Sequence, residues 1–205
     1  MDALKILFRI VEEGDNILAV FPDMYSFFIA SKWISENYIE PLWLIWTDIG
    51  VERINHISRK YGFPTSGRAV IVNSNKVCEP LNTIYYLNII EDIDKLGDIL
   101  SEDRVVISFG IDFLKIYNSK LLNEVIKLIA ETNRSIIINA IFDKTLLDVL
   151  IPFHDALVEI VKNEDIGAFY HPYVAKLKFY MKNGSTVISI PLNISGSFDD
   201  IDEGR

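Results

Sequence analysis

The sequence predicts a three-layer α/β fold: a mainly parallel, twisted sheet flanked by helices, with an antiparallel hairpin at its C-terminal end. Three observations predict it. Short, almost wholly apolar runs recur along the chain, amphipathic segments lie between them, and an Asn-Gly pair separates two alternating segments near the end. Continuous apolar runs are typical of parallel strands that helices cover on both faces.

Five apolar runs are expected to be buried strands. They are NILAVF at 16–21, PLWLIW at 41–46, RAVIV at 68–72, RVVISF at 104–109 and SIIINAIF at 135–142. Amphipathic spacing predicts helices between and around them. These are an N-terminal helix with Leu4, Leu7, Ile10 and Val11 on one side, and helices at 24–37, 50–61, 89–101 and 119–132.

The end of the chain changes character. Residues 154–161 are expected to form one more strand, which leads into a hairpin around Asn183-Gly184, because both turn residues tolerate positive φ. The polar, acidic segment 195–205 is expected to be a flexible tail, with an interaction tail as the alternative. We therefore predict a single domain at 1–194.

Composition restricts the class of partner. The 205-residue chain carries a net charge of −9, whereas phosphate neutralisation by a basic face supplies most non-specific affinity for nucleic acids, so a nucleic-acid partner is not expected. No apolar run approaches the roughly 20 residues of a membrane span, and the N-terminus lacks a basic start. A single cysteine, Cys78, fits a reducing compartment. We expect a cytoplasmic protein.

The order of these elements resembles the RecA/KaiC-like branch of the P-loop ATPases over most of the chain. GDNILAVFPDMYSFFIASKWISEN, at 14–37, is similar to the family's first strand, phosphate loop and helix. PLWLIWTDIGVERINHISRKYGFP, at 41–64, is similar to its second strand and helix, and DRVVISFGIDFL, at 103–114, to its Walker B strand. SIIINAIF and PFHDALVEI, at 152–160, resemble later strands. The resemblance implies a RecA-like fold and, since members commonly form rings or filaments, self-association or pairing with an active paralogue. Such domains are common in archaea, some of them in uncharacterised families.

The chain departs from this family at the phosphate loop. A Walker A loop, G-x-x-x-x-G-K-[ST], cradles phosphates with backbone N–H groups, a Lys and an Mg²⁺-binding hydroxyl. Its eight positions are occupied here by Phe21, Pro22, Asp23, Met24, Tyr25, Ser26, Phe27 and Phe28. Phe27 stands in place of the Lys, and Ser108 in place of the metal-orienting Asp of Walker B. Family-type ATP hydrolysis and a bound cofactor are therefore not expected.

The sequence leaves two roles open for Phe27 and Phe28. They are core residues of the helix at 24–37, filling volume that a nucleotide would occupy, or they line an exposed apolar groove for a ligand or partner. Three carboxylates, Asp48, Asp112 and Asp143, follow strands whose carboxyl ends should share one edge of the sheet. They could hold a divalent metal through oxygen ligands, or simply cap helices.

Other reactive side chains show no catalytic spacing. His56, His154 and His171 lie too far apart in the sequence to suggest a zinc site. His154 beside Asp155 resembles half of a catalytic triad, but no G-x-S-x-G elbow completes it. Cys78 lies in a segment with little positive charge and is expected to be structural.

Three functions follow as hypotheses. The first is a non-catalytic RecA/KaiC-like domain that acts as a protein-interaction, scaffold or regulatory module, with a protein partner or self-association. The alternative is a small-molecule or nucleotide binder with a rebuilt site at the carboxyl ends of the strands. The third is an enzyme that uses the rim carboxylates and a metal.

Overall fold

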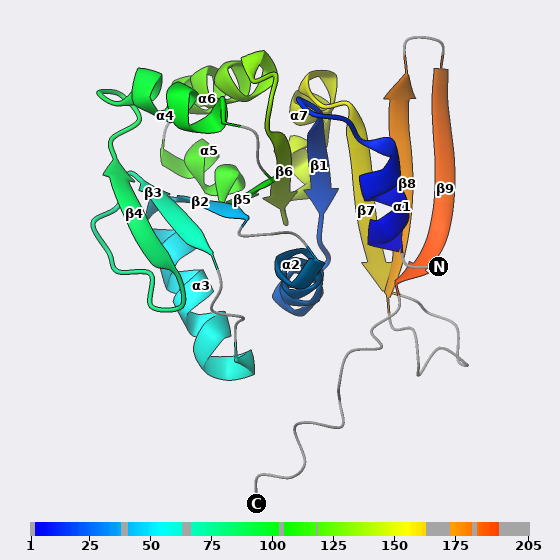
Figure 1. The fold of residues 1–205 in the computed structure, drawn as a ribbon, viewed down its shortest axis with the longest axis horizontal. Helices are drawn as coiled ribbons and strands as arrows, with labels where there is room; N and C mark the ends of the chain where they lie inside the picture. Colours follow the sequence, from blue (N-terminus) through cyan, green and yellow to red (C-terminus); the bar gives the residue numbers. More distant parts are fainter. Residues whose placement is uncertain are drawn as a thin grey trace, which may run out of the picture.

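The computed structural model describes residues 3–37, 41–62, 67–102, 105–117, 119–162, 173–181 and 184–192. The strands are β1 Asn16–Val20, β2 Leu42–Trp46, β3 Arg68–Val72, β4 Asn82–Leu87, β5 Val105–Phe109, β6 Ile136–Ile141, β7 Ala156–Lys162, β8 Tyr173–Met181 and β9 Gly184–Leu192. Within the described ranges they form one nine-stranded sheet in the order β4-β3-β2-β5-β6-β1-β7-β8-β9 (Figure 1). The strands from β4 to β7 in this order are parallel, and β8 and β9 are antiparallel to their neighbours.

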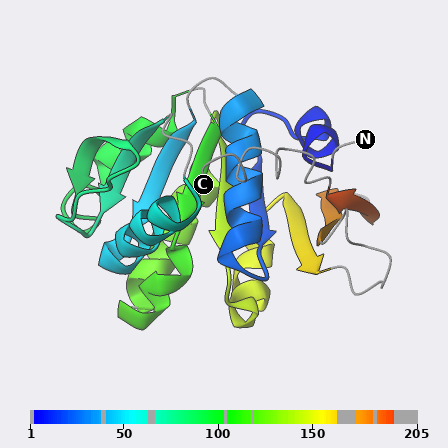
Figure 2. The same cartoon turned by 90° about the horizontal axis from the view of Figure 1, so that it is seen from below.

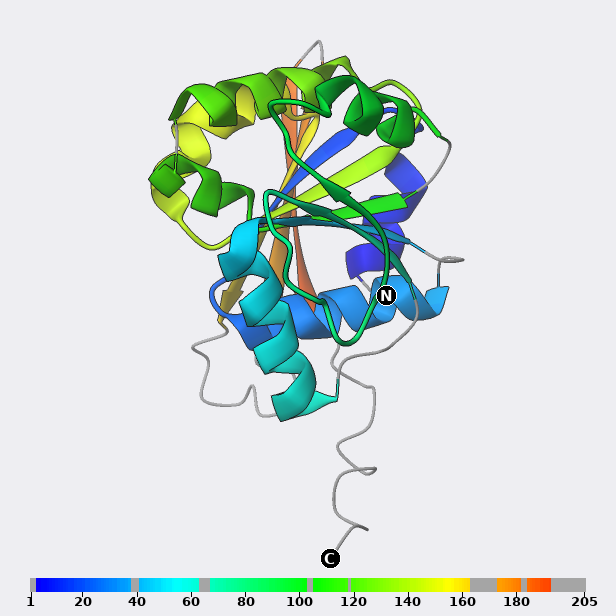
Figure 3. The ribbon, with the colours of Figure 1, turned by 90° about the vertical axis from the view of Figure 1, so that its left-hand side faces the viewer.

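Helices cover both faces of this sheet. They are α1 Ala3–Ile10, α2 Met24–Asn37, α3 Thr47–Tyr61, α4 Ile93–Leu100, α5 Leu114–Tyr117, α6 Ser119–Glu131 and α7 Leu147–Leu150, with 3-10 turns η1 Ile111–Phe113, η2 Lys144–Leu146 and η3 Ile151–Phe153. Buried residues of α2 and α3 form one core with one face of the sheet, and those of α4 and α6 form a second core with the other. Figure 3 shows the sheet between these two layers, and Figure 2 looks onto the face that α2 and α3 cover.

The predicted fold class, a three-layer α/β fold with a mainly parallel sheet and a C-terminal antiparallel pair of strands, is confirmed. Every residue of β1 and β2 is buried, which explains why these strands are continuous apolar runs rather than alternating ones. The strand that resembles Walker B, β5, is separated from β1 by one strand, β6. The carboxyl ends of β2, β5, β6 and β1 therefore share one edge of the sheet.

Several elements differ from the sequence prediction. Strand β4 was not predicted, because it lies at the edge of the sheet and most of its residues are exposed or partly exposed, so it lacks the continuous buried run of β1 and β2. Helix α3 begins at Thr47, three residues before the predicted start, and α4 begins at Ile93, four residues after the predicted start at 89. The Asn183 turn residue, part of the predicted domain and the predicted tail fall outside the described residues. Among the described helices, none is long and apolar enough to cross a membrane.

His154 and Asp155 do not form half of a triad. His154 is buried, its Nδ1 donates to the Leu150 carbonyl at 2.7 Å, and its Nε2 accepts from the Asn139 amide at 3.0 Å. Burial lowers the pKa of His154, so the imidazole is held neutral in the core. The Asp155 carboxylate instead accepts the Asn16 backbone N–H at 2.9 Å, which fastens the start of β1.

Candidate functional site

Aromatic side chains fill the junction between β1 and α2. Phe27, on the first turns of α2, is 1% exposed, and its ring centroid lies 4.8 Å from that of Phe109 and 5.3 Å from that of Phe21. Phe142 and Trp43 complete the contact at 6.0 and 6.3 Å. Three of these four pairs meet edge to face, which aromatic quadrupoles favour. We call these five residues the aromatic cluster.

The aromatic cluster includes Phe21 and Phe27 of the segment that we compared with a phosphate loop. Phe21 directly follows β1, Phe109 ends β5 and Phe142 directly follows β6. The cluster therefore covers the carboxyl ends of three neighbouring strands, beneath the first turns of α2. Its rings occupy the space between these strand ends and the helix.

Helix α2 begins on a carboxylate that the chain itself supplies. Asp23 Oδ1 accepts a hydrogen bond from the Ser26 backbone N–H at 2.9 Å, as a helix N-cap does. The Lys162 ammonium and the Tyr173 hydroxyl each lie 3.1 Å from Asp23 Oδ2. Burial alone would raise the pKa of Asp23, but the hydrogen bonds from Ser26, Lys162 and Tyr173 hold this pKa below its ordinary value. A helix N-terminus favours anions, and here a carboxylate already occupies it.

The rest of the 21–28 segment continues this packing. Its buried residues are Phe21, Ser26, Phe27 and Phe28, its half-buried residues Asp23, Met24 and Tyr25, and its exposed residue Pro22. Phe28 is 8% exposed, and its ring lies 5.9 Å from that of Tyr61 on α3. Phe27 and Phe28 are therefore core residues, and they do not line an exposed groove.

Ser108 is closed off from any ligand at the end of β5. The residue is completely buried, and its hydroxyl accepts a hydrogen bond from Trp46 Nε1 at 2.9 Å. An indole N–H can only donate, so it fixes the hydroxyl oxygen as an acceptor inside the core. The position that would orient a metal in a Walker B strand is thus used to join β2 to β5.

The three rim carboxylates have separate environments. Asp143 caps η2 by accepting the Thr145 N–H at 2.9 Å, as the helix-capping alternative predicted. Asp112 is buried and accepts the Phe142 N–H at 3.1 Å, and burial raises the pKa of this carboxyl. Asp48 is half exposed and lines a separate cavity. Within the described parts of the chain, no group of three or more His, Cys, Asp or Glu side chains could hold a metal ion.

An open cavity lies over the carboxyl ends of β2, β3 and β4. Its volume is about 780 Å³, within the range of small-molecule sites, and we call it the edge cavity. It is lined by Asp48, Asn73, Ser74, Asn75, Lys76, Tyr86, Leu87, Asn88, Ile90 and Asp92. Asp48 is the one predicted rim residue in this lining. The Lys76 ammonium pairs with Glu52 and lies 4.0 Å from Asp48 Oδ2.

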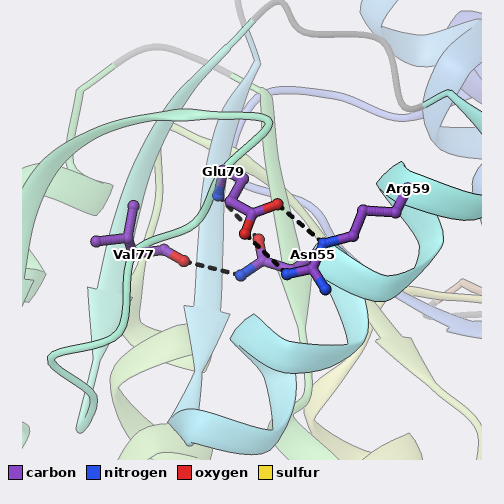
Figure 4. Close-up of polar contacts among 4 residues, drawn as sticks. All are labelled: Asn55, Arg59, Val77 and Glu79. Atoms are coloured by element: carbon purple, nitrogen blue, oxygen red, sulfur yellow. Dashed lines mark hydrogen bonds and ion pairs between the residues drawn. The ribbon is translucent and has the colours of Figure 1, made fainter.

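The loop that forms one wall of the edge cavity is fastened to α3 (Figure 4). The Asn55 side chain donates to the Val77 carbonyl at 2.8 Å and accepts the Glu79 N–H at 2.8 Å, as a paired strand would. Two hydrogen bonds, at 2.8 and 3.1 Å, join the Arg59 guanidinium to the Glu79 carboxylate. Cys78, between these contacts, is buried, and burial raises the pKa of its thiol to about 12, so the thiol is structural.

The residues that directly follow three of the strands at this edge have a left-handed backbone conformation. Thr47, Asn73 and Gly110 directly follow β2, β3 and β5, and their φ angles are 64°, 55° and 90°. Asn and Gly adopt this conformation readily, but a β-branched residue does so at a cost. Thr47 is also buried, and its hydroxyl has no hydrogen-bond partner. Strain of this kind gathers at functional sites, and here it stands beside Asp48.

Sequence reasoning missed two parts of this edge. It did not place Phe109 and Phe142 against Phe27. Phe109 ends β5 and Phe142 directly follows β6, and the carboxyl ends of these strands meet at the same edge of the sheet. Sequence reasoning also did not single out the polar stretch from Asn73 to Lys76. The signal was the run of short polar residues directly after a buried strand, where ligands of parallel sheets bind.

We expect Phe27→Ala to destabilise the protein strongly. The substitution empties the centre of the aromatic cluster, and such large-to-small changes in a core cost about 3–5 kcal/mol. Chemical denaturation should show this loss, while Phe153→Ala, at a position that is 43% exposed, should cost about 0.5 kcal/mol or less. Equal stabilities of the two variants would contradict the packing described for Phe27. Phe27→Lys should lower the stability of the protein more than Phe27→Ala does, because it buries a charge.

Comparison with known proteins identifies relatives of this chain. No family model matches the sequence. An uncharacterised protein of Archaeoglobus fulgidus is 37% identical over 190 residues, which cover 92% of this chain and 96% of that protein. Two solved structures share the fold. PH0250 from Pyrococcus horikoshii OT3 matches with a TM-score of 0.62 and 14% identity over 78% of this chain and 87% of its own. The uncharacterised PH0321 from Pyrococcus horikoshii, in complex with an unknown peptide, matches with a TM-score of 0.52 and 11% identity. This match covers 90% of this chain and 97% of PH0321. At its level of identity and coverage, the first comparison shows that this chain belongs to the same family as the Archaeoglobus fulgidus protein.

Proposed function

We propose that this protein is a non-catalytic RecA-like domain that acts through contacts with other protein chains and does not hydrolyse ATP. The observation that carries the proposal is the filled junction between β1 and α2. The buried ring of Phe27 stands where a phosphate-binding Lys would be, and the Asp23 carboxylate takes the helix N-terminus. A triphosphate entering here would lose its counter-ion and meet a negative charge.

Three observations support protein contacts as the role. Two of the exposed large apolar side chains, Val77 and Tyr85, lie on β4 or on the segment before it, outside the lining of the edge cavity. Within the described sheet β4 is an edge strand, bonded to β3 alone, and such edges can pair with another chain. PH0321, which shares the fold, was solved with a peptide. The partner we propose is a second copy of this chain, joined at the β4 edge.

A second candidate function, small-molecule binding, is favoured by the edge cavity. The cavity contains Asp48 and lies at the carboxyl ends of parallel strands, where open α/β sheets bind ligands. It stands over β2, β3 and β4, away from the aromatic cluster at β5, β6 and β1. A site there would not depend on the phosphate loop.

Nucleotide titration tests the loss of ATPase function. With ATP or ADP, with or without Mg²⁺, we expect no change in the thermal unfolding midpoint. A nucleotide that binds would add about 2.7 kcal/mol of stability at 100 times its dissociation constant. For a chain of this size that is a rise of roughly 5–10 °C. Such a rise would overturn the proposal that the nucleotide space is filled.

Sedimentation velocity tests the proposed partner. We expect the average sedimentation coefficient to rise with protein concentration and this rise to disappear in Tyr85→Glu, which places a charge on the β4 edge. Tyr85 lies under Lys95, at 4.4 Å from ring centroid to ammonium, so a glutamate there keeps a cationic neighbour. Val149→Glu, on α7, is the matched control and should associate as the parent does. A constant coefficient at the value of a monomer would refute self-association.

A further inference from the structure

We propose that the edge cavity binds a neutral, polyhydroxylated ring, such as a monosaccharide or the ribose of an unphosphorylated nucleoside. The inference rests on the second candidate function, a small-molecule site at this edge, and goes beyond it by naming the class of ligand. Four features of the cavity carry it: its charge, its hydrogen-bonding groups, its apolar surface and its rigidity.

The charges of the edge cavity disfavour anions. Two carboxylates, Asp48 and Asp92, line the cavity against one ammonium, Lys76. That ammonium is already paired with Glu52 and lies near Asp48. A phosphate group would therefore face two like charges, and the nearby cation is partly neutralised. A ligand without phosphate avoids this repulsion.

The polar groups of the edge cavity suit hydroxyls. Asn73 Oδ1 accepts the Ile89 N–H at 2.9 Å and Asn88 Oδ1 accepts the Ile90 N–H at 3.1 Å, which fixes both amides with their Nδ2 groups as the remaining donors. Asp48 supplies acceptor oxygens on the same wall as Lys76. A hydroxyl both donates and accepts, so it can use amide donors and a carboxylate acceptor together. Neighbouring hydroxyls on one ring match this mixture.

The edge cavity also has an apolar side. Tyr86, on β4, is 46% exposed, and Ile90, just beyond the strand, is 74% exposed. An aromatic ring with a polar tip is a common platform for ligands that are apolar on one face and wet on the other. The C–H face of a sugar ring is such a surface. Burying it against Tyr86 and Ile90 would remove apolar area from water on both molecules.

The walls of the edge cavity are already ordered. Asn55 and the Arg59–Glu79 pair hold residues 77–79 on α3. Lys76 is held by Glu52. The Asn73 backbone donates to the Leu87 carbonyl at 2.8 Å, which ties the end of β3 to the end of β4. A preformed site loses little conformational freedom on binding, so even a small neutral ligand can gain measurable affinity.

Titration of the full chain, followed by ¹H–¹⁵N NMR, tests the proposal. The probes are D-ribose, D-glucose, myo-inositol and inorganic phosphate, each to about 50 mM, enough to detect millimolar binding. We expect at least one neutral probe to shift the amide signals of residues 73–76 and 86–92 saturably, and phosphate to leave them unchanged. Tyr86→Ala and Asp48→Asn should each weaken this binding about 10-fold, the size of one good polar or stacking contact.

Matched variants separate contact from folding. Phe153→Ala, an exposed aromatic residue far from the cavity, and Asp94→Asn, outside the lining, should bind as the parent does. If phosphate shifts these signals and no neutral probe does, the ligand class is wrong while the site at this edge survives. If no probe shifts them, the ligand class and the second candidate function both fail. Equal weakening by Phe153→Ala and Tyr86→Ala would also overturn the proposal.

Discussion

The first turn of α2 is the point on which the rest of this structure depends. A helix N-terminus has backbone N–H groups without partners inside the helix, and in a phosphate loop a ligand satisfies such groups. Here Asp23 caps the helix, Lys162 of β7 balances its charge, and the Tyr173 hydroxyl of β8 donates a hydrogen bond to it. Phe27, one turn later, packs into the ends of β5, β6 and β1. One short segment therefore fastens the parallel strands, the helix and the antiparallel strands together.

This arrangement divides the carboxyl edge of the sheet into two parts. Over β5, β6 and β1 the edge is closed by aromatic rings, and Ser108 is engaged by Trp46 inside the core. Over β2, β3 and β4 the edge is open, polar and held in shape by α3. Parallel sheets bind ligands along this edge, so closing one part leaves the other as the available site.

The central strands could be predicted because burial on both faces leaves a continuous apolar run, as in β1 and β2. Strand β4 could not, because an edge strand with exposed tyrosines keeps no such run. The residues at 21–28 do not match a Walker A loop, but their contacts depend on Phe109 and Phe142, which are distant in the sequence. The role of Asp23 likewise depends on Lys162, which only the sheet order brings near. Among the rim residues that the sequence predicted, only Asp48 lines the edge cavity.

A crystal structure grown with Mg²⁺ and a non-hydrolysable ATP analogue would show whether the protein itself fills the space at residues 21–28. We expect Phe27 to stay in the aromatic cluster, in contact with Phe109, Asp23 still to cap α2, and no nucleotide density to be present at residues 21–28. Density for a nucleotide at this junction, with the Phe27 ring turned out of the core, would contradict this expectation.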